Sequence, residues 1–212
     1  MKIKKNIQAV LKRGMYNLNT QEKIRNYILS SSEIVHGSVL LAPNIEKSII
    51  AIVKCFRRGN KVVLFGNGGG AADAQHIAAE FIGRFKINRK SLPAIALSDN
   101  PSTITAISND FSFDLVFSRQ CESLISKGDV VIGISTSGNS LNVKKGINTS
   151  KKNGAITIGL LGNNGGSIKK CVDIPIIVNS TSTPRIQEVH RTIYHIVCEI
   201  VEKELVGSSR KK

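Results

Sequence analysis

Short apolar runs alternate with longer stretches of helical periodicity along most of the 212-residue chain. From residue 61 onward, five apolar runs have the length and the Val and Ile content of β-strands. They are Val62–Phe65, Ala94–Leu97, Val130–Ser135, Ala155–Leu161 and Val172–Val178. The stretches after them predict one helix that reaches about Phe85 and others over Pro101–Ile107, Leu115–Ser126, Leu141–Asn153 and Arg185–Leu205. Strands that alternate with helices predict a five-stranded parallel sheet with helices on both faces, and right-handed crossovers make this a doubly wound α/β fold.

Two helical stretches precede the first strand. Glu22–Val39 and Asn44–Phe56 show helical periodicity and are separated by Gly37 and Pro43. We expect this helical pair to lie outside the α/β core and to contribute contacts between subunits. The chain then divides into a helical extension over residues 1–58, one α/β domain over residues 59–206 and a basic tail over residues 207–212.

The chain is strongly basic, with a formal net charge of +15 and a pI near 9.9. A basic surface attracts phosphate groups of any kind, so charge alone does not distinguish nucleic acid from a small ligand. The densest groups lie near the two ends and consist of Lys2, Lys4, Lys5, Lys12 and Arg13, and of Arg210, Lys211 and Lys212. Such tails are typical of solvated charge, and no basic helix interleaved with aromatic residues is visible, so we expect no specific nucleic-acid partner.

The four cysteines lie far apart and form no Cys-x-x-Cys pair; they are Cys55, Cys121, Cys171 and Cys198. This spacing favours reduced, mostly buried thiols in a cytosolic protein. The chain has no run of about 18 apolar residues of the kind that spans a membrane. The N-terminus also lacks the uninterrupted apolar segment of a signal peptide, so we expect a cytoplasmic protein that is not inserted in a membrane.

The most informative segment is the loop after the third predicted strand. It carries four hydroxyl side chains, Ser135, Thr136, Ser137 and Ser140, and a helix is expected to begin near Leu141. The free backbone N–H groups and the positive dipole end of that helix would face whatever the loop binds, which predicts an anion site. No Gly-Lys-Ser/Thr sequence is present, so a triphosphate with magnesium is disfavoured. The alternative is an ordinary serine-rich N-cap and turn.

A glycine-rich loop follows the first predicted strand. Its sequence, Gly66-Asn67-Gly68-Gly69-Gly70-Ala71, formally satisfies the dinucleotide fingerprint G-x-G-x-x-G/A. An NAD site also needs an acidic residue about 20 positions later, at the end of the second strand. Residues 86–93 offer none. We therefore interpret the loop as a turn that lets a substrate approach the backbone.

The next helix carries a histidine and a carboxylate one turn apart. His76 and Glu80 stand at i and i+4, so both side chains leave the same helix face. An imidazole and a carboxylate at this spacing can share a metal ion or a substrate proton, although a simple surface pair is the alternative. Arg84 extends the predicted face by another turn, where it could pair with Glu80 or bind an anion.

The last helix carries Gln187, His190 and His195. A histidine in an apolar helix is usually packed or hydrogen-bonded, but two of the chain's four histidines lie here beside a glutamine. Gln187 and His195 are separated by a rise of roughly 12 Å in a straight helix. Either Gln187 reaches far to a shared ion, or two chains contribute to the site. His190 is the alternative ligand if His195 is displaced.

Together these motifs resemble the sugar isomerase (SIS) domain and, within that family, the phosphoheptose isomerases. The motifs are Gly-Asn-Gly-Gly at 66–69, His76 with Glu80, Asn109-Asp110, Ser-Thr-Ser-Gly-Asn-Ser at 135–140 and Arg-Ile-Gln-Glu-x-His at 185–190. The resemblance covers about residues 25–206. It implies a flavodoxin-like, five-stranded parallel sheet and the conversion of sedoheptulose 7-phosphate to D-glycero-D-manno-heptose 7-phosphate, for the heptose of lipopolysaccharide or capsule. It also implies a cytoplasmic homotetramer with active sites between subunits.

The resemblance further implies a role for each matching residue. The phosphate would be bound by Ser135, Thr136, Ser137 and Ser140, and the sugar by Asn67, Gly68, Gly69, Asn109 and Asp110. One zinc ion per subunit would be bound by His76, Glu80, Gln187 and His195, and Glu80 and His195 would also transfer protons. A glutamate that binds zinc tightly is a weaker base, so Glu80 is left open as base, ligand or both.

One position departs from the family pattern. Gly70 stands where the family usually has serine, which removes one hydroxyl donor and leaves the backbone N–H. The competing interpretations are a non-catalytic SIS protein that binds or senses a sugar phosphate, and an NAD oxidoreductase. The first would keep the phosphate loop and lose part of the set formed by His76, Glu80, Gln187 and His195, and the second lacks its acidic residue.

Overall fold

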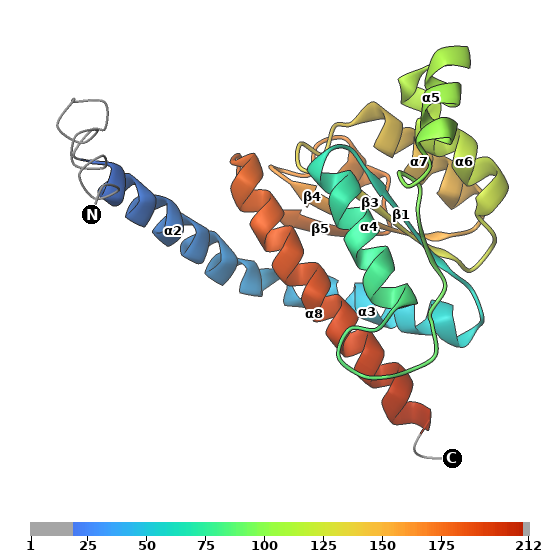
Figure 1. Ribbon diagram of the computed structural model, residues 1–212, viewed down its shortest axis with the longest axis horizontal. Helices are drawn as coiled ribbons and strands as arrows, with labels where there is room; N and C mark the ends of the chain where they lie inside the picture. Colours follow the sequence, from blue (N-terminus) through green and yellow to red (C-terminus); the bar gives the residue numbers. More distant parts are fainter. Residues whose placement is uncertain (1–18, 210–212) are drawn as a thin grey trace, which may run out of the picture.

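A five-stranded, all-parallel sheet forms the centre of the protein. The structure is a computed structural model that describes residues 19–209 (Figure 1). The strands run in the order β2-β1-β3-β4-β5. Their bounds are Val62–Gly66 for β1, Ala94–Ala96 for β2, Val130–Ser135 for β3, Ile156–Gly162 for β4 and Ile174–Val178 for β5. This order is the flavodoxin-like arrangement of a doubly wound sheet, so the predicted fold class is confirmed.

Helices cover both faces of the sheet (Figure 1). One face carries α3 (Ala42–Arg57), α4 (Gly69–Ile82) and α8 (Thr183–Ser209), and the other carries α5 (Pro101–Asp110), α6 (Val116–Leu124) and α7 (Leu141–Lys152). Each face has its own apolar core cluster. Every residue of β1 and β3 is buried, because side chains on both sides of these central strands meet a helix layer. That double burial explains why the strands appear in the sequence as continuous apolar runs.

The predicted elements match the observed ones with shifts of a few residues at their ends. The helix expected from Leu115 to Ser126 is a short 3₁₀ turn, Phe113–Leu115, followed by α6. Two further 3₁₀ turns cover Ser38–Leu41 and Ile168–Lys170. The last helix begins earlier than expected, with Pro184 in its first turn, where a missing N–H costs nothing.

The two N-terminal helices differ in their packing. Helix α2 (Thr20–Gly37) has no buried residue and extends away from the sheet (Figure 1). Helix α3 instead buries seven residues, and Ile45, Ile49 and Ile52 belong to the core cluster that also contains residues of β3 and β5. The expectation that both helices lie outside the α/β core is therefore wrong for α3. The apolar stripe of α3 recurs at helical spacing and packs on the sheet face instead of on α2.

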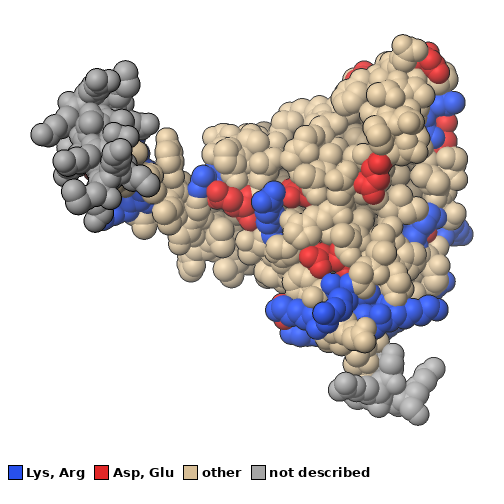
Figure 2. Space-filling view, viewed as in Figure 1, with Lys and Arg blue, Asp and Glu red and all other residues tan. Residues whose placement is uncertain are grey.

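Positive charge gathers at one end of the molecule. Figure 2 shows Lys and Arg concentrated around the C-terminal part of α8. The basic groups predicted near the two chain ends fall on residues 1–18 and 210–212, outside the described residues. Over residues 19–209, no helix combines the length and the apolar character needed to cross a membrane.

Candidate active site

The loops after β1 and β3 lie side by side at the carboxyl edge of the sheet, because β1 pairs with β3 up to Gly66 and Ile134. With α4 and α8 they enclose a small cavity of about 90 Å³. Its lining includes Asn67, Ser135, Thr136, Ser140, Gln187 and His190. Ligands of doubly wound proteins bind at this edge, where neighbouring crossovers leave opposite faces of the sheet. The cavity thus brings together residues of both predicted loops and of the last helix.

The hydroxyl loop is held in a compact turn by its own serines. The Oγ atoms of Ser135 and Ser140 lie 3.0 Å apart, and the backbone N–H of Gly138 donates to Ser135 Oγ at 3.1 Å. Helix α7 begins at Leu141, as the sequence predicted, and Ser140 stands at its N-cap position without a side-chain capping hydrogen bond. The loop thus places hydroxyl groups and the N-terminus of α7 at one point, which is the chemistry of an anion site.

A glycine is required at position 138. Its φ is +66°, and a Cβ at this position would overlap the backbone of Gly165. The Gly138 carbonyl accepts from the N–H of Ile168 at 3.0 Å, and Asn139 Oδ1 accepts from the N–H of Ser167 at 2.9 Å. The loop after β4 therefore braces the hydroxyl loop from behind.

The glycine-rich loop contacts both neighbouring elements. Asn67 and Asn142 form a reciprocal amide pair, each donating its Nδ2 to the other's Oδ1 at 2.9 Å. A Cβ at Gly69 would collide with the Gln187 amide, so glycine there leaves room for the Gln187 side chain. The N–H of Gly70 donates to Asn67 O at 2.9 Å. The backbone N–H that glycine keeps at this position is therefore used by the first turn of α4.

A group of three potential metal ligands lies between α4 and α8. One ligand atom from each of His76, Glu80 and His195 can be chosen so that all lie within 4.8 Å of one another. His76 Nε2 is 3.0 Å from Glu80 Oε1. Burial and the neighbouring His76 lower the pKa of His195, which favours its neutral, ligand-competent form. The two helices thus assemble a nitrogen and oxygen donor set that suits a transition metal.

Gln187 lies eight residues before His195 on α8 and contributes to a different part of the site. Its amide packs against Gly69 and lines the small cavity. Gln187 and His195, which a straight helix separates by roughly 12 Å, therefore lie in two adjoining sites on α8. Its assignment as a metal ligand stays a prediction.

Three predicted substrate residues lie away from the small cavity. Helix α4 ends at Ile82, so Arg84 does not extend the face of His76 and Glu80, and the expectation that it would is wrong. The backbone at Gly83, with φ −76° and ψ −111°, leaves the helical path before Arg84. Among the described residues Arg84 forms no ion pair with Glu80. Asn109 and Asp110 are exposed at the end of α5 and bond to each other at 2.9 Å.

Two residues of the site were not singled out from the sequence. Asp73 is 2% exposed and lines the small cavity, and burial raises its pKa. The Tyr194 hydroxyl lies 3.0 Å from His76 Nδ1 and 3.5 Å from Asp73 Oδ1, and burial raises its pKa to about 12. The available signal was positional, because Asp73, His76 and Glu80 follow the i, i+3, i+7 spacing of one helix face.

His190 is fully buried beneath the cavity. Its Nε2 donates to Leu161 O at 3.1 Å, and no partner for Nδ1 is found within residues 19–209. Burial lowers its pKa to about 4, so the imidazole is neutral at pH 7. His195 lies in the group with His76 and Glu80, so the condition under which His190 would replace it as a ligand is not met.

The arrangement as a whole combines an anion site with a proton-transfer and metal-binding group. The hydroxyl loop can bind a phosphate, and the two helices that help to line its cavity, α4 and α8, also carry the carboxylate and the two imidazoles. Such a set suits proton abstraction next to a carbonyl in a phosphorylated substrate.

Comparison with known proteins supports the same family. Residues 26–162 match the sequence model of the SIS domain. A phosphoheptose isomerase of Geobacter sp. (strain M21) is 54% identical over 165 residues, which is 78% of this chain and 86% of that protein. A phosphoheptose isomerase of Geotalea daltonii is 47% identical over 190 residues, which is 89% of this chain and 99% of that protein.

The solved structure of a phosphoheptose isomerase from Neisseria gonorrhoeae superposes with a TM-score of 0.83 at 35% identity, over 87% of this chain and 99% of that one. The chain therefore belongs to the SIS domain family and, within it, to the phosphoheptose isomerases.

Proposed function

We propose that the protein is an aldose-ketose isomerase that converts sedoheptulose 7-phosphate to D-glycero-D-manno-heptose 7-phosphate, for the heptose of lipopolysaccharide or capsule. The observation that carries this proposal is that the His76, Glu80 and His195 group lies on α4 and α8, the two helices that also line the cavity of the phosphate-type loop. A protein that only sensed a sugar phosphate would need the loop and not the group. The relatives named above are 54% and 47% identical, which supports the same reaction.

The hydroxyl loop would bind the phosphate end of the sugar. Ser135, Thr136, Ser137 and Ser140 surround the N-terminus of α7, where free N–H groups and the helix dipole favour an anion. Asn67, Gly68 and Gly69 would approach the sugar itself. The high positive charge of the chain would raise the local concentration of the doubly anionic substrate.

Glu80 and His195 would move the protons. Shifting a carbonyl between C1 and C2 requires a base that takes a carbon-bound proton and a group that stabilises the enediolate oxygen. The His195 imidazole is kept neutral by burial and by His76, so it can both accept and donate. Glu80 would be the carboxylate base. Its side chain is 21% exposed and lies beside His76.

Zinc fits the donor set. His76, Glu80 and His195 supply two imidazoles and one carboxylate, a combination found in catalytic zinc sites that keep an open position. One zinc ion is assigned to each subunit, and Gln187, whose amide here contacts Gly69, would turn toward that ion as the fourth donor. Zinc bound there would polarise the carbonyl oxygen of the sugar as a Lewis acid.

The assembly would be a cytoplasmic homotetramer with active sites between subunits. An apolar groove of about 980 Å³ runs between α2, α3 and α8, away from the predicted site residues. Helix α2 in turn exposes Ile24, Tyr27 and Ile28, at 52%, 65% and 64% of their surface. A patch and a groove of this kind suit a second copy of the chain.

Within this proposal, residues 1–58 contribute to the contacts between subunits, residues 59–206 form the SIS domain and residues 207–212 are a basic tail. Arg84, Asn109 and Asp110 would reach substrate only in the assembled enzyme.

The test is direct conversion of sedoheptulose 7-phosphate by purified protein, followed by NMR. We expect the aldose product, loss of activity with a chelator and recovery with added zinc. Ser123→Ala, at an exposed position of α6 on the other face of the sheet, is the control variant. An active protein free of metal would reassign His76 and Gln187 as substrate-positioning groups. No product under any condition, together with tight binding of the sugar phosphate, would favour the non-catalytic role instead.

A further inference from the structure

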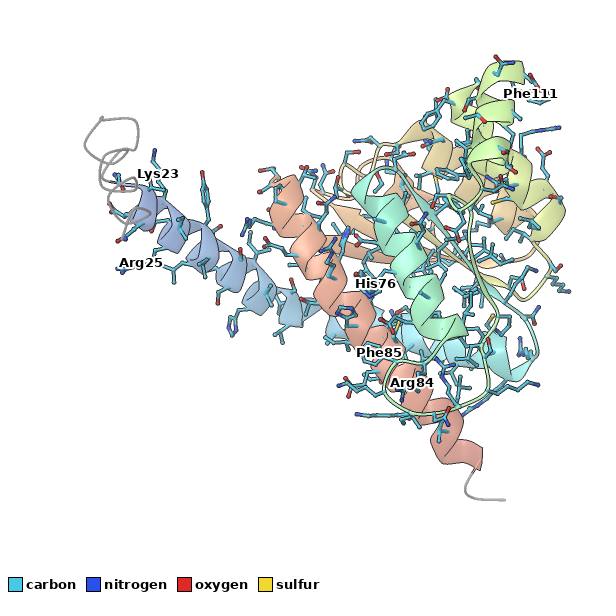
Figure 3. All side chains as sticks on the ribbon, in the orientation of Figure 1. Lys23, Arg25, His76, Arg84, Phe85 and Phe111 are labelled. Carbon is cyan, nitrogen blue, oxygen red and sulfur yellow. The ribbon has the colours of Figure 1, made fainter. Side chains whose placement is uncertain are left out.

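Two facing helix stripes surround His76. On α4, Asp73, His76 and Glu80 lie along one face, and on α8 the facing residues are Arg191 and Tyr194. His76 lies between the two helices in Figure 3. Each ring nitrogen of His76 therefore meets a different group: Tyr194 at Nδ1 and Glu80 at Nε2. The proton on the imidazole can reside on only one of these nitrogens when the ring is neutral.

Asp73 favours one direction for the Tyr194 hydroxyl. The Asp73 carboxylate is 2% exposed, and its Oδ1 lies 3.5 Å from Tyr194 Oη and 3.3 Å from Arg191 Nε. An ionised carboxylate can only accept hydrogen bonds, so the tyrosine proton is attracted toward Asp73. The Tyr194 oxygen is then an acceptor, and it faces His76 Nδ1 at 3.0 Å. A proton on Nδ1 completes this chain of hydrogen bonds.

The same chain leaves Nε2 of His76 without a proton. That nitrogen points at Glu80 Oε1, 3.0 Å away, so two acceptors face each other. Only a cation or an extra proton between them makes this contact favourable. In the opposite arrangement Tyr194 donates to Nδ1 and Nε2–H donates to Glu80, and the lone pair that a metal needs is occupied.

We propose that Asp73 and Tyr194 are positioning residues that hold His76 as the Nδ1–H tautomer and so keep Nε2 available to the metal. This inference rests on the metal site proposed above. Neither residue touches the metal in this scheme, and both act through His76. Partners of this kind orient a histidine ligand and fix its tautomer.

The first measurement is zinc affinity, by competition with a chromophoric chelator. Tyr194→Phe removes the hydroxyl and keeps the ring, which packs edge-on against His76 and His195 with centroids 5.3 and 4.7 Å away. We expect zinc to bind about 10- to 100-fold more weakly, the usual effect of losing such a partner. Asp73→Asn should weaken binding in the same direction. Ser123→Ala, which removes an exposed hydroxyl from α6 on the other face of the sheet, is the control and should leave affinity unchanged.

The second measurement is the tautomer of His76 in metal-free protein that carries Glu80→Gln, from long-range ¹H–¹⁵N spectra with His76→Gln for assignment. The glutamine amide can donate to Nε2, so two acceptors no longer face each other there. We expect Nδ1 to carry the proton in this background, and the population to move toward Nε2–H when Tyr194→Phe or Asp73→Asn is added. A role in packing alone would not move this signal. An unchanged tautomer in both variants, or zinc affinity within twofold of the wild type in both, overturns the inference. A wild type that binds no zinc refutes the proposed metal site, while the tautomer measurement still judges Asp73 and Tyr194.

Discussion

Buried His190 should make the stability of the protein depend on pH in a defined way. Its imidazole is 0% exposed, and its Nε2 is bonded to Leu161 O. Burial lowers the pKa from its ordinary value of 6.5 to about 4. The unfolded chain therefore takes up a proton at this residue more readily than the folded protein does.

The size of the effect follows from the two pKa values. Each pH unit between them corresponds to about 1.4 kcal/mol, so a pKa lowered from 6.5 to about 4 contributes on the order of 3 kcal/mol. Because the pKa is lower in the folded protein, burial of neutral His190 adds to the free energy of unfolding above pH 6.5, and this addition is lost as the pH falls through 4. Because His190 is completely buried, solvent does not reduce this difference in free energy.

The assay is urea unfolding of the wild type and His190→Gln at a series of pH values from 7 to 4. Glutamine can still donate to Leu161 O and has no charge to gain in this range. We expect the wild type to lose about 3 kcal/mol more free energy of unfolding across the series than the variant does. Exposed His36 on α2 supplies the control, since His36→Gln should keep the wild-type pH dependence.

The comparison between variants removes the contribution of the carboxylates, which titrate in all three proteins. Parallel curves for the wild type and His190→Gln would refute the reasoning. They would mean that the His190 imidazole gains a proton as easily in the folded protein as in the unfolded chain.

Three further sets of substitutions test the site. Glu80→Gln and His195→Gln should each lower turnover of sedoheptulose 7-phosphate by roughly 10²- to 10⁴-fold with the circular dichroism spectrum unchanged, because each removes a proton-transfer group. Gly70→Ser adds the hydroxyl that the family resemblance implies at this position; its Cβ would lie 3.2 Å from Ile134 Cγ2, so after a small shift we expect a lower KM and an unchanged kcat. Gly138→Ala should reduce the free energy of unfolding by about 1–3 kcal/mol, because φ is +66° and the Cβ would overlap Gly165.

Each set has its own control and its own contrary result. Near wild-type turnover in Glu80→Gln or His195→Gln would show that the proton-transfer assignment is wrong. A raised KM in Gly70→Ser would mean that the contact with Ile134 distorts the cavity more than the hydroxyl helps. Gly37→Ala, at a helical glycine with open space around it, should be neutral or slightly stabilising, and equal losses in both alanine variants would contradict the role given to φ at Gly138.

The sheet and the hydroxyl loop could be predicted because their signals are local. Central parallel strands are buried on both faces, so β1 and β3 appear as unbroken apolar runs. The N-cap at Ser140 and the i, i+4 spacing of His76 and Glu80 are likewise set by neighbours in the sequence. A single helix is enough to place those two side chains on one face.

Contacts between helices could not be predicted in the same way. The burial of α3, the end of α4 before Arg84 and the packing of Gln187 against Gly69 each depend on how one element meets another. Tyr194 also has no local signal, since an aromatic residue on an apolar helix is usually part of the core.

The sequence by itself determined the α/β fold, the phosphate-type loop and the residue types available for chemistry, since all of these follow from periodicity and short-range spacing. Only the tertiary structure decided which of those residues meet. His76 and Glu80 come from α4 and His195 from α8, and their common space exists because the two helices pack together on the same face of the sheet. The crossing of α4 and α8 depends on the summed packing of both helices on the sheet, which no short stretch of sequence encodes.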